Sequence, residues 1–292
     1  MEKINYNCCI CGVDDTSLIF QNNGFNLVKC KICGLIYVNP RLSDGTQLEI
    51  YSDKYFNIRN MEDKYSENGN DIIRVFRKKS FKLELDRLEN FNIKNGRVLD
   101  MGCGEGYFLE VAQEKGWEIY GVEVSEFASK VAEGRLKRKI FNGFLRDAHF
   151  PDKYFDLITL FDTIEHLSDP FLELKEINRI LKNGGFIYIQ TPNIGGLFAR
   201  LMGKRWFQIK PEEHIYYFNK KNIRTILEKS EFSIVSFNTY GKVLTIEYVQ
   251  HILALTNTTI SKVIKLLFSR LPFYRIPFYM KTGHLGVLGK KI

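Results

Sequence analysis

Apolar and polar residues alternate along the middle of the chain in a way that predicts strands and helices in turn. After Gly96, short apolar runs of strand length are each followed by a longer amphipathic segment with helical spacing. The predicted strands occupy 97–102, 117–124, 139–144, 155–161 and 185–192, and the predicted helices occupy 106–116, 125–138 and 169–184. Strands joined by helices of this length indicate βαβ units, so we expect an α/β fold with a parallel sheet covered on both faces.

Two further segments have helical periodicity. One spans 72–91 and leads into the alternating region. The other has an apolar stripe with lysines opposite and stops at Pro272; the stripe consists of Ile260, Val263, Ile264, Leu267, Phe268 and Leu271. This stripe has two interpretations: it covers the sheet, or a basic amphipathic segment at 258–280 contacts an anionic membrane.

Charge is distributed unevenly along the 292 residues. The net charge is +8, but all 34 acidic residues lie at or before Glu247, and the residues from Tyr248 onward include seven Lys or Arg. The body is therefore nearly neutral and the last segment is basic, which argues against nucleic acid as a general partner. No apolar run approaches the ~20 residues of a membrane span, and no apolar leader follows Met1. We expect a cytoplasmic protein with possible membrane association, of unknown oligomeric state.

Five of the six cysteines lie in the first 33 residues. Cys8 and Cys11 form one C-x2-C pair and Cys30 and Cys33 form another, and each pair is followed by glycine. This spacing predicts a structural zinc site with four thiolate ligands, and Cys9 is left over. Free thiols and a disulfide framework are the alternatives, against which the doubled CxxCG argues. We expect a zinc ribbon over 1–45, a linker over 46–74 and a main domain over 75–292.

A glycine-rich turn follows the first strand of the main domain. It reads Asp100-Met-Gly102-Cys-Gly104-Glu-Gly106, and the next strand ends in Glu123. Glycines at a strand-to-helix turn let a ligand approach the backbone, and an acidic residue at the next strand end can bind ribose hydroxyls. Tyr107 stands where the dinucleotide motif G-x-G-x-x-G requires glycine, which counts against NAD.

These features together resemble the class I S-adenosylmethionine-dependent methyltransferases. The resemblance rests on the segments VLDMGCGEG, GVEVS, FDLITLFDTIEHLSDP, LKNGGFIYIQTPN and EEHIYYFNKKNIRTILEKSEFSIV. It implies a Rossmann-like seven-stranded sheet, mostly parallel with an antiparallel last strand in GHLGVLGKKI, and S-adenosylmethionine as cofactor. The ribbon, with LIYVNPR and YSDKYF after it, resembles the zinc-binding leader of a branch that includes longer sugar C-methyltransferases.

The resemblance also implies roles for individual residues. Asp100 orders the glycine turn and binds the methionine amino group, and Glu123 binds the ribose. The other implied cofactor contacts are Gly102, Cys103 and Gly104 beneath the methionine, Val124 on the adenine, Leu145 and Asp147 at the adenine edge, and Phe161 and Asp162 beside the methionine. Cys103 is expected there for its size and not as a nucleophile.

Two histidines are candidate general bases. His166 follows the fourth strand of the main domain, and His214 lies at the end of 195–218, a segment that we expect to form a substrate lid. A methyl acceptor oxygen usually needs such a base, although either histidine is equally suited to order its loop. His149, His251 and His284 have no such context and are expected to be structural or exposed. Within the lid, Arg205 and Lys210 would suit an anionic substrate.

Three hypotheses about function follow. The first is a methyltransferase acting on a small molecule, a sugar, glycan or lipid-linked precursor, with oxygen favoured as the acceptor atom. The second is an RNA methyltransferase that grips RNA with the ribbon and the basic end; the balance of three lysines and three acidic residues in 1–35 argues against it. The third is a binding module without activity, against which the intact glycine turn and Glu123 argue.

Overall fold

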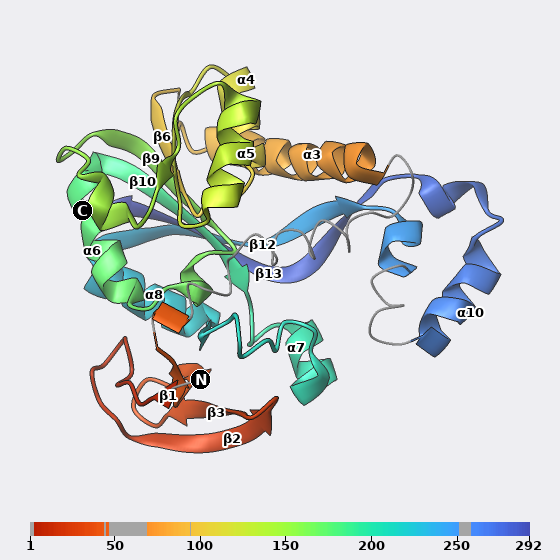
Figure 1. Cartoon of the computed structure of the whole chain (residues 1–292), viewed down its shortest axis with the longest axis horizontal. Helices are drawn as coiled ribbons and strands as arrows, with labels where there is room; N and C mark the ends of the chain where they lie inside the picture. The colour runs from red at the N-terminus through yellow and green to blue at the C-terminus, as the bar shows by residue number, and fades with distance from the viewer. Residues whose placement is uncertain (1–2, 44, 47–68, 94, 251–257) are drawn as a thin grey trace.

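A seven-stranded sheet forms the centre of the protein (Figure 1). The computed structural model describes residues 3–43, 45–46, 69–93, 95–250 and 258–292. The strand order is β12-β13-β10-β9-β6-β7-β8. The strands are β6 (Arg97–Met101), β7 (Glu118–Glu123), β8 (Phe141–Asn142), β9 (Phe155–Phe161), β10 (Leu181–Pro192), β12 (Phe232–Leu244) and β13 (Phe278–Lys291).

The direction of the strands agrees with the sequence prediction. Strands β8, β7, β6, β9 and β10 pair in parallel, whereas β13 is antiparallel to both β10 and β12. The mostly parallel sheet with an antiparallel last strand is therefore confirmed. The strand order reverses beside β6, which is the place where ligands bind in sheets of this kind.

Helices cover both faces of the sheet. On one face pack α3 (Gly69–Glu89), α4 (Tyr107–Glu114) and α5 (Glu126–Leu136), whose buried side chains form one core cluster with Val98 and Tyr188. On the other face α6 (Pro170–Ile180) and α8 (Lys220–Lys229) share a second cluster with the sheet. The side chain of Ser125 caps α5 by accepting from the Ala128 amide, as its position predicts.

Two boundaries in this region differ from the prediction. The helix expected to end at Gly184 ends at Ile180, because Leu181 pairs with Phe155 of β9 and so already belongs to β10. Gly184 lies in the irregular part of that strand with a φ of 73°. The strand expected over 139–144 is only Phe141–Asn142, because its pairing with β7 is limited to two residues.

The ribbon is built from short strands and is completed by a distant segment. Its sheet has the order β11-β4-β3-β2, in which β2 (Thr16–Asn22), β3 (Phe25–Cys30) and β4 (Ile36–Val38) are joined by β11 (Tyr216–Tyr217). Strands β1 (Lys3–Ile4) and β5 (Arg41–Leu42) pair separately. The N-terminal segment is thus anchored to the main domain by backbone pairing, at the bottom of Figure 1.

The segment expected to form a lid packs partly on the ribbon. It contains α7 (Leu197–Met202) and the 3-10 helix η3 (Gly203–Arg205). Trp206 and Ile209 are buried in a cluster with ribbon residues such as Phe25 and Leu27. By contrast, Leu197 and Leu201 of α7 are 70% and 75% exposed. Movement of this segment as a lid remains a prediction.

The helix with the apolar stripe, α10 (Thr258–Phe268), does not cover the sheet. Figure 1 places it beyond the ends of β12 and β13, and the short η4 (Pro272–Arg275) follows it in the chain. Leu267 of the stripe is 60% exposed, and neighbouring Leu266 is 81% exposed. The sheet-covering interpretation is therefore wrong, because the helix lies past the end of the long β12–β13 strand pair and not over a face of the sheet. Of the predicted linker 46–74, residues 47–68 lie outside the described residues, as does His251, and 69–74 already belong to α3.

Across the described ranges, no helix combines the length and the apolar composition that crossing a bilayer requires.

Candidate active site

The turn between β6 and α4 has the backbone geometry that its glycines predict. Gly102, Gly104 and Gly106 have φ values of 74°, 53° and 79°, in the left-handed region that side chains disfavour. A Cβ on Gly102 would lie 2.6 Å from Oγ1 of Thr163, whereas a Cβ on Gly104 would meet no atom within 4 Å. Gly102 therefore permits close packing, and Gly104 leaves open space above the turn.

Glu123, at the end of β7, is tied to this turn by its side chain. Its Oε2 accepts a hydrogen bond of 2.7 Å from the amide of Gly104, and its Oε1 accepts one of 2.9 Å from the amide of Ser125. The residue is buried and lines the cleft described below. The remaining lone pairs of both carboxylate oxygens can accept hydrogen bonds from a ligand.

Asp100 lies beneath the turn and is almost fully buried. Its Oδ1 accepts a hydrogen bond of 2.7 Å from Thr159, but burial raises the pKa of Asp100 to about 8. The neighbouring Cys103 is also buried, and burial raises the pKa of its thiol well above the usual range. A thiol in that state is a poor nucleophile, which fits the expectation that Cys103 is present for its size.

A cleft of about 830 Å³ opens above the glycine turn. It falls within the range of ~300–1,000 Å³ that ligand pockets occupy. The predicted residues that line it are Asp100, Gly102, Cys103, Gly104, Glu123, Val124, Leu145, Phe161, Asp162, His166, Lys210 and His214. Asp147 and Arg205, also singled out from the sequence, are exposed and lie outside this lining.

Polar side chains from three strands meet at the end of β9. Asp162 has a φ of 50° and accepts a hydrogen bond of 2.7 Å from Gln190 of β10. Lys242 of β12 and His284 of β13 each place a nitrogen 3.5 Å from its carboxylate. Burial lowers the pKa of His284 to about 4, against the opposing charge of Asp162. His284, expected from the sequence to be structural or exposed, is buried and also lines the cleft.

The two candidate bases lie side by side. The ring centroids of His166 and His214 are 4.8 Å apart. Nδ1 of His166 lies 2.8 Å from the carbonyl oxygen of Glu213, and Nδ1 of His214 lies 2.9 Å from that of Gln208. A carbonyl only accepts, so Nδ1 carries the proton in each neutral ring and the lone pair is on Nε2.

Glu165 completes this group, although the sequence did not single it out. One ligand atom each from Glu165, His166 and His214 lie within 4.8 Å of one another. Burial, together with the charge of Asp162, raises the pKa of Glu165 well above its usual range. Burial, together with His166 and Lys210, lowers the pKa of His214 well below its usual range. Both shifts favour the uncharged forms of Glu165 and His214.

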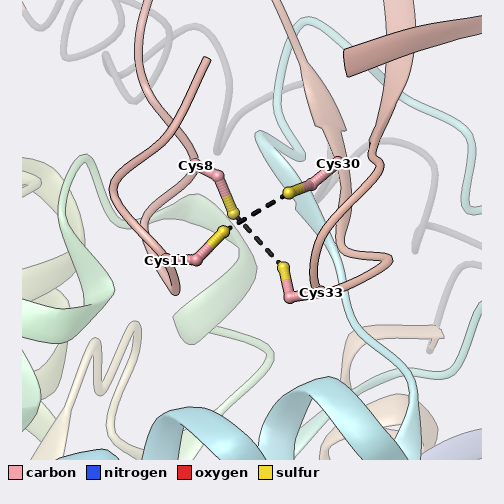
Figure 2. Close-up of side chains that lie close together, drawn as sticks. All are labelled: Cys8, Cys11, Cys30 and Cys33. Carbon is pink, nitrogen blue, oxygen red and sulfur yellow. Dashed lines mark hydrogen bonds between the residues drawn. The ribbon is translucent and has the colours of Figure 1, made fainter. Parts of the chain in front are cut away.

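The four cysteines of the doubled motif converge on one point in the ribbon (Figure 2). The Sγ atoms of Cys8 and Cys33 are 3.4 Å apart, as are those of Cys11 and Cys30, and all four thiols are free of disulfides. Burial opposes ionisation of Cys30, but hydrogen bonds from the amide of Cys33 and from the Cys11 thiol bring its pKa down to about 7. Four sulfurs at this spacing fit a tetrahedral zinc ion with Zn–S bonds of about 2.3 Å, and Cys9 is not among them.

Comparison with known families decides the identity of the main domain. The family described as "Methyltransferase domain" matches residues 73–237, which is more than half of the chain. The chain belongs to the class I S-adenosylmethionine-dependent methyltransferases. In this methyltransferase the matched region begins in α3 and ends in β12, and so contains the whole β6–β10 part of the sheet.

Curated relatives match about a third of this chain. A probable S-adenosylmethionine-dependent methyltransferase of Mycolicibacterium smegmatis is 33% identical over 97 residues, covering 33% of this chain and 38% of the relative. A ubiquinone biosynthesis O-methyltransferase of Nitrosomonas europaea is 31% identical over 104 residues, covering 33% of this chain and 43% of the relative. The matched part thus spans less than half the length of these relatives.

Solved structures share the fold of the methyltransferase. A SAM-dependent methyltransferase from Archaeoglobus fulgidus superposes with a TM-score of 0.52 at 26% identity, covering 74% of this chain and 96% of that one. A possible histamine N-methyltransferase from Thermotoga maritima gives a TM-score of 0.51 at 21% identity, covering 76% and 92%, and shows the fold alone.

Proposed function

We propose that this chain transfers a methyl group from S-adenosylmethionine to a hydroxyl oxygen of a small molecule, a sugar, glycan or lipid-linked precursor. The observation that carries the proposal is that residues suited to the cofactor and residues suited to an acceptor line the same cleft. The glycine turn and Glu123 line one part of it, and the imidazoles of His166 and His214 line another.

The residues of the turn fit the cofactor chemically. Glu123 can bind two ribose hydroxyls, and Asp100 is placed to interact with a cationic amino group, which would favour its ionised form. The open space above Gly104 admits the cofactor close to the backbone. When bound, S-adenosylmethionine supplies a methyl group that its sulfonium has already activated.

The chain contributes mainly position and hydrogen bonding to this reaction. Holding acceptor and methyl donor in line can supply on the order of 7–11 kcal/mol of the barrier at best. An oxygen acceptor also has to lose its proton, and the imidazoles of His166 and His214 line the cleft that would hold the acceptor hydroxyl. The oxygen–carbon bond forms as the carbon–sulfur bond breaks, and S-adenosylhomocysteine leaves with the electron pair.

The acceptor side of the cleft is suited to a hydroxyl-rich or anionic molecule. Gln190, Gln208 and Lys242 line the cleft together with Lys210 and His284, and we assign them to its acceptor side. These groups can donate to and accept from several hydroxyls, and the two lysines can pair with a phosphate. The name of the ubiquinone biosynthesis O-methyltransferases supports oxygen as the acceptor atom. The RNA alternative finds no support among these relatives.

The ribbon is proposed to hold a structural zinc ion. Cys8, Cys11, Cys30 and Cys33 would leave no coordination position open, so the ion would stabilise the fold and take no part in the chemistry.

A membrane surface is proposed as a partner of the basic segment. The exposed leucines of α10 are accompanied by Lys262, Lys265 and Arg270, and no acidic residue occurs after Glu247. Helix α7, which packs against β13 near Gly283, also exposes two leucines beside basic residues. Apolar side chains within a basic surface complement an anionic bilayer. Such contact would suit a lipid-linked acceptor.

One experiment tests the proposed reaction. The chain is incubated with methyl-13C-labelled S-adenosylmethionine and either nucleotide sugars, polyprenyl-linked sugars or an RNA transcript, with Glu123→Ala as the inactive control. We expect S-adenosylhomocysteine and a labelled methoxy signal with a sugar acceptor. If calorimetry detects no binding of S-adenosylmethionine to the wild-type chain, the proposal is overturned; methylation of the RNA instead would favour the alternative.

A further inference from the structure

The group formed by Glu165, His166 and His214 has the composition of a metal site. Two imidazoles and one carboxylate are provided by two segments, the 3-10 helix η2 (Ile164–His166) and the residues before β11. A ligand atom from each of the three lies within 4.8 Å of the other two. Donors bound to one ion at ~2.1 Å with angles of 90–109° are ~3.0–3.4 Å apart, so capture of an ion requires the widest pair of donors to approach by no more than ~2 Å.

The hydrogen bonds of the two imidazoles orient them for coordination. The Nδ1–H groups of His166 and His214 point at the carbonyl oxygens of Glu213 and Gln208. This arrangement, a backbone acceptor on the far ring nitrogen, holds the tautomer in which Nε2 can bind a metal. The backbone of the two segments is joined as well, because the amide of Ile215 donates to the carbonyl of Glu165 at 2.9 Å.

The side chain of Glu165 is a second indication of a ligand, independent of the two histidines. Its side chain is 1% exposed, and Oε2 accepts a hydrogen bond of 2.9 Å from Oγ1 of Thr191. Its Oε1 is buried and has no hydrogen-bond partner among the described residues. A buried carboxylate oxygen without a partner is costly. A general base on His214 alone would not require that carboxylate, whereas a cation would satisfy it.

From this geometry we propose that Glu165, His166 and His214 bind a divalent first-row transition-metal ion in the acceptor part of the cleft. Imidazole nitrogens with one carboxylate suit Mn²⁺, Fe²⁺, Co²⁺ or Zn²⁺ and leave coordination positions open. The site is separate from the four cysteines, which lie in the ribbon.

The role of the ion rests on the proposed function. An acceptor hydroxyl bound to the ion loses its proton to solvent near neutral pH, because a divalent cation lowers the pKa of a bound oxygen strongly. The resulting oxygen anion attacks the methyl carbon, and the carbon–sulfur bond breaks. Open coordination positions would favour acceptors with two adjacent oxygen atoms, such as a vicinal diol. The imidazoles then act as ligands and are not themselves protonated.

Binding of Mn²⁺ to the zinc-loaded chain tests the site. Mn²⁺ has little affinity for a four-thiolate site, and the loss of its free electron paramagnetic resonance signal counts bound ions. We expect one Mn²⁺ per wild-type chain, and at least a tenfold weaker binding in Glu165→Gln and in His214→Gln. Glu212→Gln is the matched control, because Glu212 is exposed and lies outside the lining of the cleft; this variant should bind Mn²⁺ as the wild type does.

Two further measurements separate the possible results. Zinc content of one ion per chain shows that each variant retains the folded ribbon, and calorimetry with S-adenosylmethionine reports on the cofactor side. A wild-type chain that takes up neither Mn²⁺ nor a second Zn²⁺, or a Glu165→Gln variant that binds Mn²⁺ undiminished, overturns the metal site. Cofactor binding without metal binding would leave the proposed function standing, and metal binding without cofactor binding would leave only the metal site standing.

Discussion

Glu123 and Gly104 are joined by a hydrogen bond of 2.7 Å although 19 positions separate them. The bond connects the end of β7 to the turn after β6, so the two places that we propose receive the cofactor hold each other in position. Because this contact is present before any ligand binds, the turn needs little rearrangement on binding.

Replacing Glu123 tests this arrangement. We expect Glu123→Ala to weaken S-adenosylmethionine binding by about 1.5–3 kcal/mol, or roughly 10- to 150-fold, since it removes a charged acceptor and leaves the Gly104 amide unpaired. Isothermal titration calorimetry measures the change. Glu118→Gln, on an exposed position at the start of the same strand, is the control and should bind normally. Equal affinities in the two variants would contradict the assignment.

The glycines of the turn should differ in their tolerance of alanine. Gly104→Ala should lower the free energy of unfolding by about 1–2 kcal/mol, because only the left-handed backbone is strained. Gly102→Ala should cost about 1–3 kcal/mol more, because its Cβ would also collide with Thr163. Urea denaturation monitored by circular dichroism compares them, and a smaller loss in Gly102→Ala would show that the packing is described wrongly.

Cofactor affinity should depend on pH through Asp100. The pKa of this carboxyl is about 8 in the unliganded protein, and a cationic amino group beside it favours the ionised form. Binding therefore releases a proton below that pH, and affinity rises as the pH increases from 6 toward 8, by at most tenfold per unit. Calorimetry at several pH values measures this slope. In Asp100→Asn the slope should disappear; a wild-type affinity that is constant from pH 6 to 7.5 would refute the prediction.

Zinc should depend on four of the five N-terminal cysteines. Cys30→Ser is expected to lose the ion and destabilise the ribbon, because one of the four converging sulfurs is removed. Cys9→Ser, outside the cluster, should retain one zinc per chain and serves as the matched control. Elemental analysis by mass spectrometry provides the count, and equal zinc in both variants would exclude the four-cysteine site.

Membrane contact should depend on the exposed leucines of α10. Wild-type chain should sediment with phosphatidylcholine vesicles that contain phosphatidylglycerol, and less so at high salt. The double substitution Leu266→Asp and Leu267→Asp should reduce binding at least tenfold, because it removes apolar area and adds negative charge. Val235→Asp, at an exposed position on β12, is the control. A wild type that stays in the supernatant, or a double variant that still sediments, contradicts the proposal.

Local patterns predicted the parts of the site that lie close together in the sequence. The glycine turn, Glu123 at the next strand end and the cysteine pairs each follow from spacing and strand–helix periodicity. Contacts between distant strands could not be predicted in this way. His284 approaches Asp162 only because β13 inserts between β10 and β12. Glu165 could not be predicted as part of the site, because its neighbour His214 comes from a segment distant in the sequence. The apolar stripe of α10 likewise has the same periodicity whether it is buried or exposed.

The pairing of β4 with β11 has a practical consequence for anyone shortening this protein. His214 lies two residues before β11, so the loop that carries it packs against the cysteine-rich leader. Removing that leader would leave the glycine turn and Glu123 in place but would take away the strand that pairs with β11, close to His214. The ribbon is therefore better regarded as part of the fold that positions His214 than as a detachable accessory.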